Sequence, residues 1–318
     1  MERIGIAVVC GATASGKTRL AVDLAKSFDG EVVSADSMQI YTGMTIASAK
    51  PTEEEKQGIP HHLMDFLPPT EPYSVADYVD DARKVIGEIH ARGKLPILCG
   101  GTGLYISALI DNLQFDDTGA DYAFREEMRA LAAKEGNGKL LEMLRAVDPE
   151  CAARLHENNQ SRVIRALEVY RLSGKTMTQL QEESRSEPSP YDPCMMMIEY
   201  EQREMLYARI DARVDEMLEK GLADEAREFF THGDYVTASQ AIGYKELKPY
   251  LDGTETLGEC TERLKRETRR YAKRQMTWFR RDPRIHRILT ENDMDYEKIL
   301  ENAEKIIKKS SIFKKSML

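Results

Sequence analysis

The sequence predicts an α/β fold, in which a parallel sheet carries helices on both faces and an all-helical domain is inserted into the chain. Short apolar runs of strand length alternate with amphipathic stretches, as in sheets that are covered on both sides. Between residues 113 and 190 the strand signals disappear and successive stretches show helical periodicity. The length of 318 residues leaves room for about two domains with a sizeable core.

The sheet domain begins with an apolar run, Ile4 to Cys10, which breaks at Gly11 and is followed by a predicted helix from Lys17 to Phe28. This order of strand, glycine turn and helix is typical of the first unit of a parallel sheet. Four later strands and one long helix are predicted at Glu31 to Ala35, Leu95 to Cys99, Cys194 to Glu199, Arg284 to Leu289 and Val75 to Ala91.

The inserted domain is predicted to consist of successive helices at Phe124 to Lys134, Lys139 to Ala146 and Arg162 to Ser173. In the third of these, Val163, Leu167 and Tyr170 share one face, and Gly174 is a suitable stop. We therefore expect a sheet domain formed by residues 1–112 and 191–318, and a helical insertion over residues 113–190.

Composition excludes several classes of protein. The chain has 45 Lys and Arg against 54 Asp and Glu, a net charge of −9, which argues against a uniformly basic nucleic-acid coat but allows a local basic patch. No apolar run reaches the roughly 18 residues of a membrane helix, so we expect no membrane partner. The five cysteines are scattered, which disfavours a disulfide framework or a zinc site.

We expect the protein to be a cytoplasmic monomer. We expect the adjacent His61 and His62 to form structural hydrogen bonds rather than a metal site.

One motif predicts a binding site for an anion. The segment from residue 11 to residue 18 matches GxxxxGK[ST] at a junction of strand and helix, which predicts a P-loop NTPase-like sheet. In such a loop the backbone N–H groups and the helix N-terminus form a cradle for an anion, Lys17 adds a charge, and the Thr18 hydroxyl can hold Mg²⁺. The loop alone predicts a phosphate or diphosphate ligand without naming it, and a structural glycine turn is the alternative. The predicted phosphate-binding residues are Gly11, Ala12, Thr13, Ala14, Ser15, Gly16, Lys17 and Thr18.

Two further strand ends carry polar residues. Asp36 follows the second predicted strand, and Thr102 follows the glycines after residue 99. Ligands of open α/β sheets bind at the carboxyl ends of the strands, where both residues are expected. Asp36 can be a general base, a magnesium ligand or a helix cap. The glycines permit close approach to a ligand, although a plain turn is an equally good interpretation of the pattern around Thr102.

The last chemical signal is electrostatic. Residues 262–287 contain eleven Lys or Arg against three acidic residues, a local charge of +8 that leaves −17 for the rest of the chain. A solvated helix face is one interpretation, and a polyanion partner with salt-dependent binding is the other, favoured by the concentration of charge. On a helix, Leu264, Tyr271 and Trp278 would form a buried stripe. The opposite, largely basic face would contain Arg266, Arg270, Lys273, Arg274, Thr277 and Arg281.

Together these residues resemble a known family, the tRNA dimethylallyltransferases (tRNA isopentenyltransferases). The shared motifs run in family order along nearly the whole chain. They are Gly-Ala-Thr-Ala-Ser-Gly-Lys-Thr at 11–18, Ser-Ala-Asp-Ser-Met-Gln-Ile-Tyr at 34–41, Ala-Lys-Pro at 49–51, Pro-His-His-Leu at 60–63, Gly-Gly-Thr-Gly-Leu-Tyr at 100–105, Arg-Ala-Leu-Glu-Val-Tyr at 165–170, Gln-Ala-Ile-Gly-Tyr-Lys at 240–245 and Lys-Arg-Gln-Met-Thr-Trp-Phe-Arg at 273–280.

The resemblance implies transfer of a dimethylallyl group from its diphosphate to N6 of the adenosine 3′-adjacent to the anticodon, in tRNAs that read U-initial codons. The products would be N6-isopentenyladenosine and diphosphate. The loop would then hold a prenyl diphosphate with Mg²⁺ rather than ATP, Asp36 would act as general base, and Thr102 would orient the base or Asp36. The adenosine would leave the anticodon stack to reach them.

By the same resemblance, several residues border the tRNA and the helical insertion lies against its anticodon stem. The implied tRNA-binding residues are Asp36, Ser37, Met38, Gln39, Thr102, Gln160, Ser161, Arg162, Val163, Ile164, Lys273, Arg274 and Arg280, with Arg125 as a weaker candidate. Arg209 and Arg213 are candidates for further diphosphate contacts, and salt bridges with acids between Asp211 and Glu216 are their alternative.

The sequence also leaves two other functions open, a small-molecule kinase and a nucleotide switch that binds RNA. A P-loop small-molecule kinase would share the sheet and the loop, but it leaves the basic helix without a purpose. A non-enzymatic nucleotide switch that binds RNA would be expected to carry a guanine-reading NKxD pattern, which the sequence lacks.

Overall fold

The computed structural model describes residues 3–115, 119–184, 187–231, 241–291 and 295–315. The chain divides into two compact units, one formed by Met1–Ile110 and Ser189–Leu318 and the other by Asp111–Pro188. The sequence-based boundaries, after residue 112 and before residue 191, differ from these by two residues.

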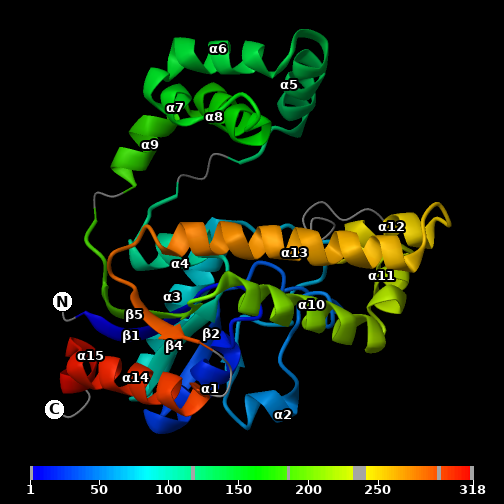
Figure 1. The fold of residues 1–318 in the computed structure, drawn as a ribbon. Helices are drawn as coiled ribbons and strands as arrows, with labels where there is room; N and C mark the ends of the chain where they lie inside the picture. Colours follow the sequence, from blue (N-terminus) through cyan, green and yellow to red (C-terminus); the bar gives the residue numbers. More distant parts are fainter. Residues whose placement is uncertain (1–2, 116–118, 185–186, 232–240, 292–294, 316–318) are drawn as a thin grey trace. The chain divides into compact units, whose positions relative to one another are not determined.

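The first unit is built on a six-stranded parallel sheet with the order β3-β2-β4-β1-β5-β6 (Figure 1). Its central strand β1 (Ile4–Cys10) pairs with β4 and β5, and its residues from Ile6 onward are fully buried. The other strands are β2 (Gly30–Ser34), β3 (His61–His62), β4 (Leu95–Gly100), β5 (Tyr191–Tyr200) and β6 (His286–Thr290). The predicted α/β class with a parallel sheet is confirmed, and the two-residue strand β3 is an addition to it.

Helices cover both faces of this sheet. Figure 1 shows α1 (Lys17–Ser27) and α14 (Tyr296–Lys309) on one side, and α3 (Val75–Ala91) and α4 (Gly103–Ile110) on the other. The bounds of α3 agree with its prediction, because Ser74 and Asp77 form a capping box at its start. The remaining helices of this unit are α2 (Glu53–Lys56), α10 (Arg203–Glu219), α11 (Leu222–Thr231), α12 (Tyr244–Leu251), α13 (Leu257–Phe279) and α15 (Ser311–Lys315).

The long basic helix α13 forms as predicted, but its buried face differs from the prediction. Trp278 was expected in the buried stripe and is 41% exposed, while Tyr271 is half-buried. Leu264 is buried as predicted, together with Cys260, Ala272 and Phe279. Gln275 is buried with them, and its side chain hydrogen-bonds to two loops at the edge of the sheet. The buried face of the helix thus includes a polar residue.

The second unit is helical and contains α5 (Tyr122–Glu135), α6 (Asn137–Val147), α7 (Pro149–Arg154), α8 (Gln160–Ser173) and α9 (Met177–Glu183). Val163 and Leu167 lie in its core as expected, whereas Tyr170 is 40% exposed. Glu168, on the same helix, is fully buried and is held by the guanidinium groups of Arg125 and Arg165. This buried ion-pair group explains why a charged residue occupies a core-facing position of α8.

Candidate active site

The predicted phosphate loop connects β1 to α1. Gly16 caps α1 without a side-chain hydrogen bond, so the first N–H groups of the helix lack a capping partner and can receive an anion. The ammonium of Lys17 donates to the carbonyl of Ala12 at 3.2 Å, which turns it back over the loop. Burial lowers the pKa of Lys17 below its usual range, an effect that Cys99 and Asp36 oppose. The arrangement therefore favours a ligand that brings negative charge to this lysine.

Two strand ends meet beside this loop. A Cβ atom at Gly100 would lie 2.1 Å from the carbonyl oxygen of Ala35, so only glycine permits this approach. The N–H of Thr102 donates to the same carbonyl at 3.1 Å. Across the junction, the Thr102 hydroxyl accepts a hydrogen bond from the Ser37 N–H at 3.0 Å. Asp36, the residue between Ala35 and Ser37, is thereby brought next to Thr102, as the sequence predicts.

One oxygen of Asp36 is held by the chain itself. Its Oδ1 accepts from the N–H groups of Met38 at 2.9 Å and of Gln39 at 3.4 Å. No described residue hydrogen-bonds to Oδ2. A carboxylate fixed by one oxygen and open at the other can receive a proton from a bound substrate.

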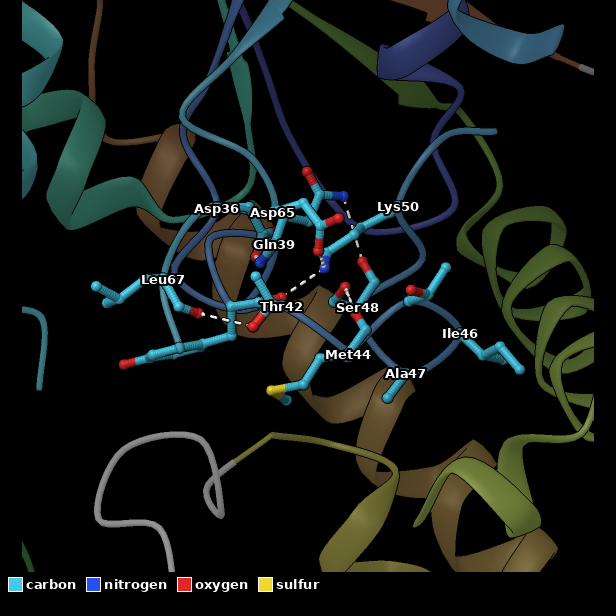
Figure 2. Close-up of polar contacts among 12 residues, drawn as sticks. Asp36, Gln39, Thr42, Met44, Ile46, Ala47, Ser48, Lys50, Asp65 and Leu67 are labelled. Carbon is cyan, nitrogen blue, oxygen red and sulfur yellow. Dashed lines mark hydrogen bonds and ion pairs between the residues drawn. The ribbon is translucent and has the colours of Figure 1, made fainter. Parts of the chain in front are cut away.

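The segment of residues 45–50, which we call the 45–50 loop, is held from two sides. Figure 2 shows the Gln39 side chain turned toward Ser48, and its Nε2 donates to the carbonyls of Ser48 at 3.2 Å and Ala49 at 3.3 Å. The ammonium of Lys50 contacts the carboxylate of Asp65 in the same view. The family resemblance implies a place for Gln39 at the tRNA, and in the structure its amide hydrogen-bonds to this loop.

Glu225, from α11, holds the other side of the 45–50 loop. Its carboxylate accepts hydrogen bonds from three consecutive backbone N–H groups, of Thr45 at 3.0 Å, Ile46 at 2.7 Å and Ala47 at 2.9 Å. The Tyr244 hydroxyl donates to the same carboxylate at 2.8 Å. The sequence did not predict this role of Glu225, since an acidic residue within an acidic amphipathic helix carries no signal of such a contact.

Gln275 is a second residue of the site that the sequence did not predict. Its Oε1 accepts from the Thr13 N–H at 2.9 Å, and its Nε2 donates to the carbonyl of Gly101 at 2.9 Å. The phosphate loop and the Thr102 loop are thus joined through one buried side chain of α13. The one available signal was a glutamine between the aromatic residues predicted to be buried, at helical spacing from both.

These elements enclose a cavity of about 320 Å³, within the usual size range of small-ligand sites. Its lining includes the polar side chains of Lys17, Thr18, Asp36 and Arg213. It also includes a set of apolar side chains, those of Ile210, Val214, Met217, Leu222, Ile242 and Leu264. A ligand that combines an anionic group with a small hydrocarbon group fits this mixed lining.

The two arginines predicted to assist the phosphate loop lie near it on α10. Arg209 donates from Nε to the carbonyl of Ala14 at 2.8 Å, and Arg213 lines the cavity. Burial lowers the pKa of Arg213, although nearby carboxylates including Asp36 oppose the shift. Arg213 forms no hydrogen bond or ion pair with any residue in the described parts of the chain, and so it is open to an anion. The acids proposed as alternative partners are engaged elsewhere, Asp211 with Arg269 and Glu216 with Lys220.

Some predicted tRNA-binding residues have other roles in the helical unit. Val163 and Ile164 are 0% and 3% exposed and their side chains form core contacts, so their predicted contact with the tRNA stays a prediction that only their backbone could fulfil. Arg125 is bound to Glu168 through two hydrogen bonds of 2.8 and 2.9 Å. Ser161 and Arg162 remain exposed at the start of α8, beside the half-buried Gln160.

Ion pairs neutralise part of the positive charge of residues 262–287. Lys265 and Arg269 of α13 pair with Asp215 and Asp211 of α10, and Arg280 and Arg287 both pair with the buried Glu199. In contrast, Lys273 and Arg281 are exposed and form no ion pair with a described residue, and Arg274 lies over the ring of Tyr271. The charge available to a polyanion is therefore concentrated in the last turns of the helix and the turn that follows it.

The two adjacent histidines form structural hydrogen bonds, as expected. His62 Nε2 lies 2.7 Å from the carboxylate of buried Glu31, and His61 Nδ1 lies 2.8 Å from the carbonyl of Ile59. Within the described residues, no helix is long and apolar enough to cross a membrane.

Known proteins are similar to this chain over nearly its whole length. A profile of the IPP transferase family matches residues 39–282, and one of isopentenyl transferases matches residues 4–66. A tRNA dimethylallyltransferase of Caldanaerobacter subterraneus subsp. tengcongensis is 48% identical over 302 residues, which cover 94% of this chain and 96% of the relative.

Solved structures agree with these sequence matches. The full-length tRNA isopentenylpyrophosphate transferase from Bacillus halodurans is 45% identical, with a TM-score of 0.71 and 96% of both chains covered. A eukaryotic dimethylallyltransferase acting on tRNA is 30% identical, with a TM-score of 0.79, and the match covers 95% of this chain and 78% of that one. The resemblance inferred from the motifs is confirmed, and the chain belongs to the IPP transferase family, whose relatives include the tRNA dimethylallyltransferases.

Proposed function

We propose that this protein transfers the dimethylallyl group of dimethylallyl diphosphate to N6 of the adenosine 3′-adjacent to the anticodon, in tRNAs that read U-initial codons. The products are N6-isopentenyladenosine and diphosphate. The observation that carries the proposal is the lining of the cavity, which combines residues of the phosphate loop and Asp36, with its open oxygen, with several aliphatic side chains. Membership of the family supports the same reaction.

The polar side chains of the lining suit a diphosphate leaving group. The uncapped start of α1, the ammonium of Lys17 and the guanidinium of Arg213 together offer donors and positive charge to an anion. Both cations are electrostatically unfavourable in this cavity while it lacks an anion, since burial lowers both pKa values. Negative charge that grows on the diphosphate during bond cleavage is stabilised by this cluster.

Magnesium fits the oxygen donors of the same lining. Thr18 and Asp36 both line the cavity, and Mg²⁺ prefers hydroxyl, carboxylate and phosphate oxygens. Among the described residues there is no group of three or more His, Cys, Asp or Glu side chains that would hold a metal alone, so the ion would bind together with the diphosphate. When bound, Mg²⁺ neutralises charge on the leaving group.

Asp36 is the proposed base. The nitrogen of the exocyclic amine forms a bond to the first carbon of the dimethylallyl group, the bond from that carbon to the diphosphate oxygen breaks, and a proton leaves the nitrogen. Asp36 Oδ2 is placed to accept that proton, because Oδ1 is held by the Met38 N–H. A positioned carboxylate typically accelerates such a step about a hundred- to ten-thousand-fold. Thr102 positions this segment through Ser37.

The tRNA is proposed to approach along the exposed cations of α13. Lys273 and Arg274 are candidates for phosphate contacts, and the exposed residues at the start of α8, such as Arg162, are candidates for contacts to the anticodon stem. An adenosine that leaves its stack can then enter the cavity. With tRNA as substrate, we propose that the enzyme acts in the cytoplasm, as a monomer.

Incubation with unmodified tRNA, dimethylallyl diphosphate and Mg²⁺ tests the proposal. We expect mass spectrometry of the digested tRNA to show one isopentenyl group on the adenosine next to the anticodon. A folded, tRNA-binding protein that leaves the RNA unmodified would contradict the proposal. Consumption of ATP with a small-molecule acceptor and without tRNA would favour a kinase instead.

A further inference from the structure

The exposed face of α13 near the cavity contains one large aromatic residue among cations. Lys273, Arg274, Thr277 and Trp278 lie at the spacing of a single face of α13, Arg281 follows two residues after the end of the helix, and all five are exposed. Trp278 is 41% exposed, although tryptophan in water-soluble folds is on average highly buried. The ion pairs that neutralise the other side of α13 do not reach this face, since Lys273 and Arg281 form none with a described residue.

Trp278 is held in a defined place. A Cβ atom at Gly103 would lie 2.4 Å from Trp278 Cδ1 and 2.5 Å from Nε1, so the five-membered ring packs directly on the glycine backbone. The indole Nε1–H also donates to the Ser107 hydroxyl at 3.3 Å. A side chain at position 103 would push the indole away. The third glycine of the Gly-Gly-Thr-Gly segment therefore serves this packing.

This place adjoins the site of the proposed reaction. Gly103 directly follows Thr102, and the Thr102 hydroxyl accepts a hydrogen bond from the Ser37 N–H. Ser37 in turn follows Asp36. Arg274, one turn before Trp278 on the same helix face, lines the cavity. An exposed aromatic ring among cations, one turn from a residue that lines the cavity, has the chemistry that binds single-stranded nucleic acid, in which cations contact phosphates and a ring stacks on a base.

We propose that Trp278 is a stacking platform for an unpaired base of the anticodon loop beside the target adenosine. The inference rests on the proposed function and adds to it a residue and a mode of contact. An adenosine that leaves the stack deprives its neighbour of a stacking partner, and the indole ring replaces that partner. Lys273 and Arg281 contact the phosphates on either side, which holds the loop backbone against the ring.

Fluorescence tests the proposal on the unmodified protein, because Trp278 is the single tryptophan of the chain. A synthetic unmodified anticodon stem-loop is titrated into the protein, and binding is followed independently by the anisotropy of a dye on the RNA. We expect strong quenching of the indole emission that saturates together with the anisotropy. A fully paired RNA duplex with the same number of phosphates should cause little quenching at equal occupancy.

Variants separate stacking from charge. Trp278→Ala should raise the KM for tRNA about fivefold to a hundredfold, with the KM for dimethylallyl diphosphate unchanged, and Trp278→Phe should restore most of the loss. The slope of log K against log salt should stay the same in Trp278→Ala and fall by about one in Lys273→Ala, because only the lysine releases counterions. Leu289→Ala, at another exposed apolar residue, is the matched control and should change none of these quantities.

The outcomes of these experiments distinguish the stacking role of Trp278 from the proposed prenyl transfer. Stem-loop binding without quenching, or an unchanged KM for tRNA in Trp278→Ala, would overturn the stacking role while leaving the prenyl transfer intact. No RNA binding by the wild-type protein would overturn the proposed function together with the stacking role. Because the fluorescence measurement uses the wild-type chain, it decides the question even if Trp278→Ala does not fold.

Discussion

Gln275 Oε1 accepts a hydrogen bond from the backbone N–H of Thr13 at 2.9 Å, which joins the basic helix α13 to the phosphate loop across 262 positions of the sequence. The same side chain donates to the carbonyl of Gly101, so a single amide spans both loops that meet at the cavity. This contact also uses the Thr13 N–H, which was expected to bind phosphate. Docking of α13 and the shape of the phosphate loop are therefore coupled.

Replacing Gln275 by Ala should affect both binding and stability. The variant leaves the Thr13 N–H and the Gly101 carbonyl without their partner, and a buried unsatisfied group costs about 1–3 kcal/mol. We expect a lower free energy of unfolding and a higher KM for dimethylallyl diphosphate, measured by denaturant titration and steady-state kinetics. Thr261→Ala, at the exposed start of α13, is the control. An unchanged KM would show that the loop keeps its shape without this contact.

Replacing Asp36 by Asn should remove the base and keep the site. The asparagine oxygen can still accept from the Met38 N–H, so the local backbone is retained. We expect kcat to fall at least about a hundredfold, with little change in the affinity for tRNA or for diphosphate. Single-turnover rates and equilibrium binding measure the two effects separately. Turnover equal to that of the wild type would mean that Asp36 is not the base.

The sequence was sufficient for features that depend on local pattern. The apolar run of β1 and the capping box of α3 have the bounds that were predicted, and the phosphate loop lies between β1 and α1. Asp36 and Thr102 lie together because the carboxyl ends of parallel strands share one edge of the sheet. These features could be predicted because they depend on hydrophobic periodicity and on the order of strands and helices along the chain.

Other features depend on contacts between distant segments, which one sequence does not reveal. Glu225 contacts backbone N–H groups about 180 residues before it, and those groups have no side-chain signature. Trp278 was placed in the buried stripe on hydrophobicity alone, whereas it is exposed and Gln275 is buried, with hydrogen bonds from its side chain. Arg125 looked available for RNA because its partner, Glu168, lies 43 residues later on another helix.

Glu225→Gln should loosen the wall of the cavity. Three backbone N–H groups point at this carboxylate, and the amide of glutamine replaces one acceptor oxygen by a donor that faces them. We expect a loss of about 1–3 kcal/mol in the free energy of unfolding and a raised KM for dimethylallyl diphosphate, since Ala47 lines the cavity. Asp224→Asn is the matched control, because Asp224 is exposed and pairs with Arg227 on the surface. Equal stability of the two variants would argue against this role.

Diphosphate binding should weaken as the pH rises through the lowered pKa of Lys17. Burial shifts this pKa below the usual lysine value, so the ammonium loses its proton at a lower pH than an exposed lysine would. Calorimetric titration with inorganic diphosphate should show the decline in the wild type and a flatter profile in Lys17→Arg, which keeps its charge. Comparison at each pH cancels the protonation of the diphosphate itself. Parallel profiles would exclude Lys17 as the titrating group.

The same lysine should act on stability with the opposite sign. In the window between its folded-state pKa and the unfolded value of about 10.4, the unfolded chain binds more protons than the native chain. The free energy of unfolding of the ligand-free protein therefore rises with pH across that window, and Lys17→Met should lack this rise. Urea unfolding of both proteins at a series of pH values measures the difference. A wild-type stability that falls relative to Lys17→Met would show that the buried ammonium is stabilised by its surroundings and that the site does not depend on an anion to offset its charge.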